Sequence, residues 1–120
     1  MPRRPMTIRI YHNPRCSKSR QTLELIRDAG EETEVIEYLQ TPPTQKELDG
    51  LLKMLGLEPQ ELMRKGEAVY KELGLGDKEL SRKEAIRIMV ENPKLIERPI
   101  VVKGNRAVLG RPPENVNELL

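Results

Sequence analysis

Cys16 is the residue of this sequence best suited to chemistry, because it is the only cysteine and lies in a polar, basic segment. A cysteine reacts as its thiolate, and a free thiol with a pKa of about 8.5 is mostly protonated at neutral pH. We expect Cys16 just before a helix, where unpaired N–H groups and the helix dipole favour an anion. Arg15, Lys18 and Arg20 add positive charge. We predict a reactive thiolate; the alternative is a small buried hydrophobic cysteine, the commoner fate of a free thiol.

The neighbours of Cys16 could support such a thiolate. His12 lies four residues upstream, although it could equally be a loop histidine hydrogen-bonded to the backbone. Ser17 and Ser19 can donate hydrogen bonds to the thiolate or cap the helix. Because N–H groups at a helix start also receive oxyanions, a nucleophile and a cradle for its anionic substrate would coincide here.

Two arginines stand out as further anion ligands. Arg98 and Arg111 each precede a proline, which stiffens an extended segment at an expected strand boundary. The planar arginine fork grips an oxyanion at two points. The alternative for each residue is an exposed surface charge, the usual role among 21 lysines and arginines.

Composition limits the other possibilities. A chain of 120 residues suits one domain, and its formal charge of +2 gives no overall field for nucleic acid or for a membrane surface. One cysteine and one histidine predict no internal disulfide and no metal site. No apolar run approaches the roughly eighteen residues of a membrane span, and the first residues do not resemble a signal peptide, so we expect a cytoplasmic protein.

The first third of the chain predicts a β-α-β unit. Residues 7–11 and 34–39 are short and rich in β-branched residues or tyrosine, as strands are. Between them an apolar helical face ends at Gly30. Such a unit makes two parallel strands and places the Cys16 loop at the carboxyl end of the first one.

The middle predicts only helices. Thr44-x-x-Glu47 is a capping box that opens an amphipathic helix ending at Gly56. A shorter helix is expected from Pro59 until Gly66. Ser81-x-x-Glu84 is a second capping box, and its helix should end before Asn92-Pro93.

The last third returns to strands. Residues 100–103 and 106–109 flank Gly104-Asn105, a pair typical of a type II′ hairpin turn, and a short helix should follow from residue 113 or 114. The order β-α-β, helices, β-β-α is that of an α/β thioredoxin-like fold. We expect a central mixed sheet of about four strands flanked by helices, with a helical insertion at about 44–92 of a single domain, 1–120.

From about residue 7 to its end, the sequence resembles the glutaredoxin-coupled arsenate reductases of the ArsC family. The resemblance rests on several segments in order: Ile10-Tyr11-His12-Asn13-Pro14-x-Cys16 with Ser19-Arg20, Tyr38-Leu39-x-Thr41-Pro42-Pro43-Thr44, Leu62-Met63-Arg64-Lys65, Tyr70-Lys71-Glu72-Leu73, Asn92-Pro93-x-Leu95-Ile96-x-Arg98-Pro99-Ile100-Val101-Val102, and Gly110-Arg111-Pro112.

This resemblance implies a thioredoxin-like arsenate reductase. The Cys16 thiolate would attack arsenate to form a covalent thiol-arsenate adduct, which glutathione then attacks. Glutathione is thus a co-substrate, glutaredoxin a transient reductant, and no cofactor stays bound. We expect a monomer that uses neither nucleic acid nor membrane.

The resemblance also assigns roles to residues. His12 would help to lower the pKa of Cys16, and Pro99 matches the cis-proline of thioredoxin-like proteins. The oxyanion ligands would be Arg64, Arg98 and Arg111. The supporting loop residues would be Asn13, Ser17, Ser19 and Arg20.

Two departures keep other functions open. The chain has Ser17-Lys18 where well-studied reductases carry smaller uncharged residues, and it ends at Leu120 without their longer C-terminal tail, as in a short branch of the family. One alternative is a regulatory module like the Spx-type transcription factors, which bind RNA polymerase and commonly carry a Cys-x-x-Cys switch; here the second position is Ser19. Another is a glutathione-dependent thiol reductase with a different substrate.

Overall fold

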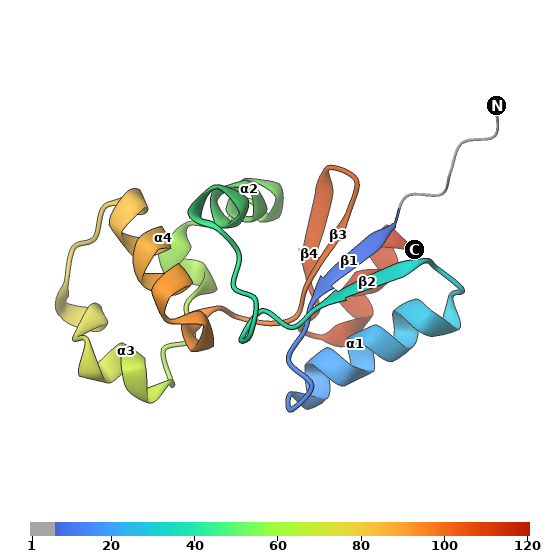
Figure 1. The fold of residues 1–120 in the computed structure, drawn as a ribbon, viewed down its shortest axis with the longest axis horizontal. Coiled ribbons are helices and arrows are strands. Elements are labelled where there is room, and N and C mark those ends of the chain that lie inside the picture. The colour runs from blue at the N-terminus through green and yellow to red at the C-terminus, as the bar shows by residue number, and fades with distance from the viewer. Residues whose placement is uncertain (1–6) are drawn as a thin grey trace. The chain divides into compact units, whose positions relative to one another are not determined.

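The computed structural model describes residues 7–120 and divides into two compact units (Figure 1). The first unit comprises the described residues up to Tyr38 together with Arg98–Leu120, and the second is Leu39–Glu97. The expected helical insertion falls within the second unit. Residues 1–6 lie outside the described part of the chain. The expectation that the first residues are not a signal peptide concerns this segment.

The first unit is built on a mixed sheet of four strands. The strands are β1 (Ile8–Tyr11), β2 (Thr33–Ile36), β3 (Ile100–Lys103) and β4 (Arg106–Leu109). In the order β2-β1-β3-β4, β1 runs parallel to β2 and antiparallel to β3, and β3 runs antiparallel to β4. The mixed α/β sheet confirms the predicted fold class. It also brings the start of β3 beside the end of β1, where Tyr11 pairs with Ile100.

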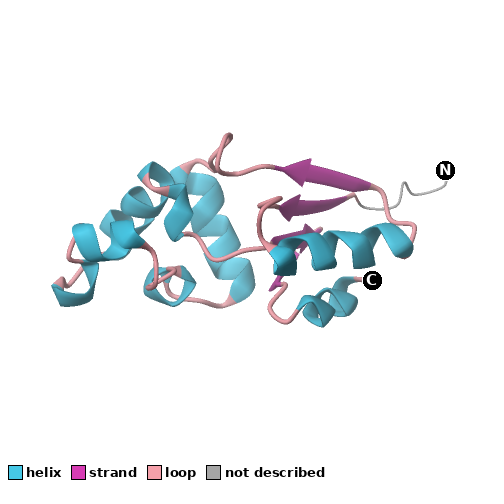
Figure 2. Ribbon diagram, turned by 90° about the horizontal axis from the view of Figure 1, so that it is seen from below, coloured by secondary structure: helices cyan, strands magenta, loops and turns pink. Residues whose placement is uncertain are grey.

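Two helices cover one face of this sheet: α1 (Ser17–Asp28) and the 3-10 helix η4 (Pro113–Leu119). Figure 2 shows both on the same side of the strands. Their apolar side chains meet alternate residues of the strands, as the two-residue period of a strand requires. The resulting buried cluster consists of Ile8, Ile10, Leu23, Ile26, Val101, Val116 and Leu119.

Several predicted elements are shorter or tighter in the structure. The strand predicted over 34–39 ends at Ile36 because its partner β1 ends opposite it at Tyr11. The segment after Pro59 is a single 3-10 turn, Pro59–Leu62, and the C-terminal helix is 3-10 as well. The hairpin turn at Gly104-Asn105 agrees with its prediction. Gly104 has a φ of 64°, and Asn105 has a negative φ, since no described non-glycine residue has a positive one. A positive φ at the first turn residue and a negative φ at the second are what a type II′ turn requires.

The second unit is helical, as predicted. Its elements are α2 (Gln45–Leu55), η1 (Pro59–Leu62), α3 (Ala68–Glu72), η2 (Leu75–Asp77), α4 (Arg82–Glu91) and η3 (Pro93–Leu95). Both predicted capping boxes form: Thr44 with Glu47 starts α2, and Ser81 with Glu84 starts α4. Gly56 ends α2 in the left-handed conformation that a helix terminus favours.

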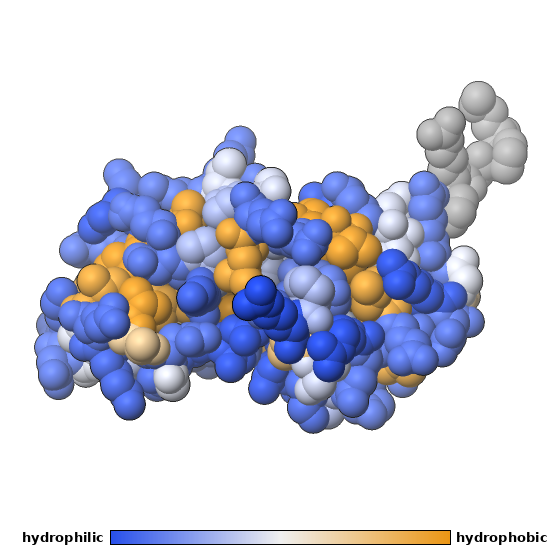
Figure 3. All heavy atoms as spheres, turned by 60° about the horizontal axis from the view of Figure 1, so that its bottom comes forward, coloured by the Kyte–Doolittle hydropathy of each residue, from blue (hydrophilic) through white to orange (hydrophobic). Residues whose placement is uncertain are grey.

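The surface is mostly hydrophilic on the face shown in Figure 3, with smaller apolar areas among charged side chains. Four large hydrophobic residues of the described chain are more than a third exposed: Val35, Leu39, Leu73 and Leu120. Within residues 7–120, no helix is both long and apolar enough to cross a membrane.

Candidate active site

The loop between β1 and α1 is held by hydrogen bonds to Asn13. The Asn13 carbonyl oxygen accepts the Cys16 N–H at 3.0 Å, and its side-chain Oδ1 accepts the Arg15 N–H at 3.0 Å. An asparagine side chain that accepts a hydrogen bond from the backbone N–H two residues later forms a tight Asx turn. Asn13 is buried, so this turn fixes where the following cysteine lies.

Cys16 is the N-cap residue of α1, as the sequence predicts. Its carbonyl oxygen accepts the first helical hydrogen bond, from the Arg20 N–H at 3.0 Å. The neutral thiol makes no capping hydrogen bond of standard geometry, whereas a thiolate there is stabilised by the N–H groups of Lys18 and Ser19. The sulfur therefore lies at the positive end of a helix of 12 residues.

The surroundings of Cys16 favour its thiolate. Burial raises the pKa of the thiol, but the backbone N–H of Ser19 and a hydrogen bond from the Arg98 guanidinium lower it. The Lys18 N–H and the charge of Arg98 act in the same direction, and the net pKa is below the ordinary value of a cysteine. Cys16 is partly exposed, as a nucleophile that meets an outside substrate must be.

Arg111 is the second arginine at the sulfur. Its Nη1 lies 3.9 Å from Cys16 Sγ and donates to the Arg98 carbonyl oxygen at 3.3 Å. Asn115 holds the chain on both sides of Gly110, because its Nδ2 donates to the carbonyl oxygens of Leu109 and Arg111 at 3.1 and 3.2 Å. Two arginines that are far from Cys16 in the sequence thus lie at its sulfur.

Close backbone packing brings the Arg111 segment to α1. The Gly110 N–H donates to the Pro99 carbonyl oxygen at 2.9 Å, and the Arg98–Pro99 peptide bond is cis. A Cβ on Gly110 would lie 2.6 Å from Thr22 Oγ1 and 2.7 Å from Pro99 Cγ. Only a residue without a side chain fits between α1 and Pro99.

His12 contacts Ser19. Its Nδ1 lies 2.6 Å from Ser19 Oγ, and the histidine is 6% exposed. Burial lowers the pKa of His12; Glu37 opposes this, and the charges of Arg27 and Arg20 reinforce it. The imidazole is therefore neutral at pH 7, so its contribution to the site is that of a hydrogen-bonding group.

Ser17 and Arg20 lie at the exposed edge of the loop. Ser17 is the first residue of α1, and Arg20 Nη1 donates to the Pro14 carbonyl oxygen at 3.0 Å. Arg20 also borders a cavity of about 460 Å³, whose lining is His12, Pro14, Arg20, Leu23, Glu24, Arg27 and Asp28. Arg20 thus braces the loop and contributes charge to its outer side.

Arg64, the third predicted arginine, belongs to the second unit, where an antiparallel bridge pairs Met63 with Ile96. The Arg64 Nη1 lies 2.5 Å from Glu97 Oε1, and its Nε lies 3.7 Å from Glu67 Oε1. Two carboxylates therefore compensate its charge. The contacts described around Cys16 come from residues of the first unit, and a role for Arg64 there stays a prediction.

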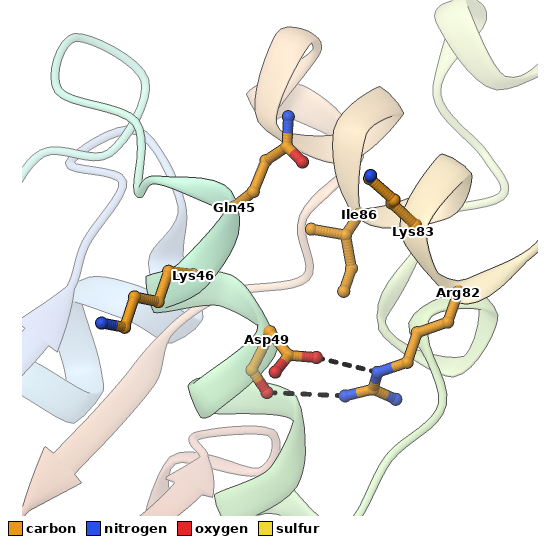
Figure 4. A pocket seen from close by; sticks show the side chains of 6 residues that line it. All are labelled: Gln45, Lys46, Asp49, Arg82, Lys83 and Ile86. Carbon is orange, nitrogen blue, oxygen red and sulfur yellow. Dashed lines mark hydrogen bonds and ion pairs between the residues drawn. The ribbon is translucent and has the colours of Figure 1, made fainter.

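A cavity of about 340 Å³ lies between α2 and α4 of the second unit (Figure 4). Across it, Arg82 Nε donates to the Asp49 carboxylate at 2.8 Å. Its lining of Gln45, Lys46, Asp49, Arg82, Lys83 and Ile86 holds no thiol or imidazole. In residues 7–120, no three histidine, cysteine or acidic side chains are grouped as metal ligands.

A model of the ArsC family matches residues 11–119. The chain belongs to the ArsC family. It is 54% identical to the uncharacterized protein YfgD of Escherichia coli K12, over 94% of this chain and 96% of that protein. It is 46% identical to the arsenate reductase of the same organism, over 94% of this chain and 80% of that protein. The structure of arsenate reductase from Vibrio cholerae superposes with a TM-score of 0.92 and 52% identity, over 98% of this chain and 100% of that chain. This similarity confirms the thioredoxin-like ArsC fold.

Three residues were not singled out from the sequence: Gly110 and Asn115 of the first unit and Glu97 of the second unit. Gly110 lies inside the recognised segment before Arg111, but its close approach to Thr22 joins positions 88 apart. Asn115 carried no signal, because an asparagine in the first turn of a short helix is ordinary. Glu97 could have been noticed as an acid directly preceding Arg98, although its ion pair with Arg64 depends on the bridge between two distant segments.

Proposed function

We propose that this protein is an arsenate reductase whose nucleophile is Cys16. The observation that carries the proposal is a cysteine at a helix N-terminus with a lowered pKa and with Arg98 and Arg111 at its sulfur. Helix N–H groups and guanidinium groups are the donors that an oxyanion requires. Family membership and the arsenate reductases among its relatives support arsenate as that oxyanion.

The first step joins sulfur to arsenic. The Cys16 thiolate attacks the arsenic(V) atom of arsenate, an oxygen of arsenate takes up protons from solvent and leaves as water, and a thiol-arsenate adduct remains. Arg98 and Arg111 neutralise the negative charge that would otherwise repel the thiolate, and they hold the anion before the sulfur. Arg64 is the third ligand by its sequence motif alone.

The next steps need outside thiols, because the sequence holds one cysteine. The glutathione thiolate attacks the Cys16 sulfur, and the electron pair of the sulfur–arsenic bond passes to arsenic, which leaves as arsenic(III) in arsenite. The product is a mixed disulfide between Cys16 and glutathione. Glutaredoxin takes up the glutathionyl group by thiol–disulfide exchange and restores the Cys16 thiol.

The lone thiol also distinguishes this function from a redox-switched regulator. Ser19 stands where a Cys-x-x-Cys switch would have its second cysteine, and it is fully buried against His12. Because the sequence has one cysteine, no disulfide can form within it. Stable co-purification with RNA polymerase, without arsenate turnover, would instead support the regulatory alternative.

The test is arsenate-dependent NADPH oxidation in a reaction coupled through glutathione, glutaredoxin and glutathione reductase, with arsenite measured as product. Wild type should turn over, and Cys16→Ser should stay at the rate without enzyme. Equal rates for the two proteins, or none for either, would reject the proposal. Turnover of other glutathione mixed disulfides without arsenate turnover would assign the thiol-reductase alternative.

A further inference from the structure

Ser19 links the histidine to the cysteine. It is the third residue of α1 and fully buried. Its Oγ lies 2.6 Å from His12 Nδ1 and accepts the Asn13 N–H at 3.1 Å. One hydroxyl therefore ties the end of β1 to the first turn of the helix that carries Cys16.

The hydrogen-bond count favours one set of roles within this network, which the tautomer of His12 decides. A serine hydroxyl has one proton to donate and two lone pairs. The Asn13 N–H occupies one lone pair, and the hydroxyl proton points to His12 Nδ1 when the imidazole is neutral and carries its proton on Nε2. A protonated His12 would also donate from Nδ1, which would leave the proton of the buried Ser19 hydroxyl without this acceptor, and an unsatisfied buried donor is unfavourable. The lowered pKa of His12 agrees with the neutral form.

The backbone of the same serine faces the cysteine. The Ser19 N–H is one of the free donors in the first turn of α1, and it stabilises the Cys16 thiolate. Its direction depends on how the first turn lies against the loop. The His12–Ser19–Asn13 hydrogen bonds join these two segments through side-chain and backbone groups that are buried.

We propose that Ser19 is a positioning residue through which a neutral His12 acts on Cys16: the hydroxyl network holds the first turn of α1 so that its N–H groups point at the sulfur. This inference rests on the proposed function only in treating the Cys16 thiolate as the reacting form. It differs from a direct action of His12 as a cation beside the thiolate, which would not need the Ser19 hydroxyl.

The test compares the pKa of Cys16 in wild type, Ser19→Ala, His12→Ala and the double variant. The rate of alkylation by neutral iodoacetamide against pH reports this pKa without ambiguity, since the chain has one cysteine. Each single variant should slow alkylation at pH 6 about three- to tenfold, as its pKa rises by roughly half to one unit. The double variant should be no slower than either. Gln21→Ala, an exposed change in α1, is the control and should match wild type.

Two outcomes of that comparison would overturn the proposal. One is an unchanged pKa in Ser19→Ala. The other is a His12→Ala effect that is as large without the Ser19 hydroxyl as with it, because two independent contributions add. Neither readout uses arsenate, so a failure here is distinct from a failure to turn arsenate over.

A second measurement needs no variant and so does not depend on whether Ser19→Ala folds. His12 is the only histidine, and the nitrogen NMR shifts of its ring report which nitrogen carries a proton. At pH 7 the neutral tautomer with an unprotonated Nδ1 is expected. A protonated Nδ1, in either the cation or the other tautomer, would contradict the proposed network.

Discussion

Arg111 Nη1 lies 3.9 Å from the sulfur of Cys16, although the two residues are 95 positions apart in the sequence. The contact is possible because β3 and β4 return the chain to the end of the sheet where β1 delivers the cysteine loop. Arg98 approaches the same sulfur from the segment that precedes β3. The two arginines at this sulfur are thus brought together by the sheet and not by one local motif.

Removing either of these arginines should weaken arsenate use. Arg98→Ala and Arg111→Ala are each expected to lower kcat/KM for arsenate by about tenfold or more, since a charge-assisted hydrogen bond to the oxyanion is lost. Steady-state kinetics with varied arsenate measures this. Arg106→Ala, an exposed arginine of β4, is the matched control. A wild-type arsenate dependence in Arg98→Ala or Arg111→Ala would remove that residue from the site.

Arg64 should matter less than these two residues. Its guanidinium already binds Glu97 and Glu67, so an oxyanion would have to share it with two carboxylates. Arg64→Ala is expected to lower kcat/KM less than Arg98→Ala does, in the same assay. A larger loss in Arg64→Ala would show that the two glutamates do not restrain it.

The Arg64–Glu97 pair should also stabilise the helical unit. Both side chains are about three-quarters buried, and Glu97→Gln is expected to lower the free energy of unfolding by about 1 kcal/mol. Glu91→Gln is the control, because the Arg87–Glu91 pair is half exposed and should contribute less than about 0.5 kcal/mol. Urea unfolding of the two variants compares them directly. Equal effects would contradict the structural importance of the pair.

Gly110→Ala should disturb the site through the backbone. Its Cβ would lie 2.6 Å from Thr22 Oγ1 and 2.7 Å from Pro99 Cγ, so the Arg111 segment or α1 must shift. We expect a loss of about 1–3 kcal/mol in stability, with a lower kcat/KM for arsenate. Gly50→Ala is the matched control: nothing lies within 4 Å of its Cβ, and within α2 it should gain about 0.5–1 kcal/mol. A neutral Gly110→Ala would show that the close packing is not required.

The lowered pKa of His12 predicts a specific pH dependence of stability. In the unfolded chain His12 takes up its proton near pH 6.5, whereas in the folded protein it does so at lower pH. Between these two pKa values the unfolded state binds more protons, so stability is lost as the pH falls through this window. His12→Gln should lack this part of the slope in unfolding measured between pH 5 and pH 7. An identical slope in both proteins would mean that His12 does not titrate differently on folding.

Much of the fold could be predicted because its signals are local. The capping boxes at Thr44 and Ser81 depend on residues three apart, and both start helices as predicted. The strand predicted over 34–39 was too long because its end is set by pairing with β1, which the segment's own composition does not reveal. The 3-10 form of the C-terminal helix could not be predicted from its length or its apolar positions.

The candidate site divides in the same way. Cys16 at the start of a helix could be predicted from the loop itself, and Arg98 and Arg111 from the prolines that follow them. The His12–Ser19 bond could not, because it needs the angle at which the loop meets α1. The ion pair of Arg64 with Glu97 depends on a bridge between segments more than thirty residues apart.

The central claim is that Cys16 is a thiolate within an oxyanion site, and the pH profile of its alkylation, with and without arsenate, tests this most directly. Wild type should react with iodoacetamide with an apparent pKa below that of a free cysteine, about 8.5. Arsenate at increasing concentration should slow the reaction to a limit, as a bound anion or adduct covers the sulfur. A profile like that of a free thiol, with no effect of arsenate, would contradict the claim.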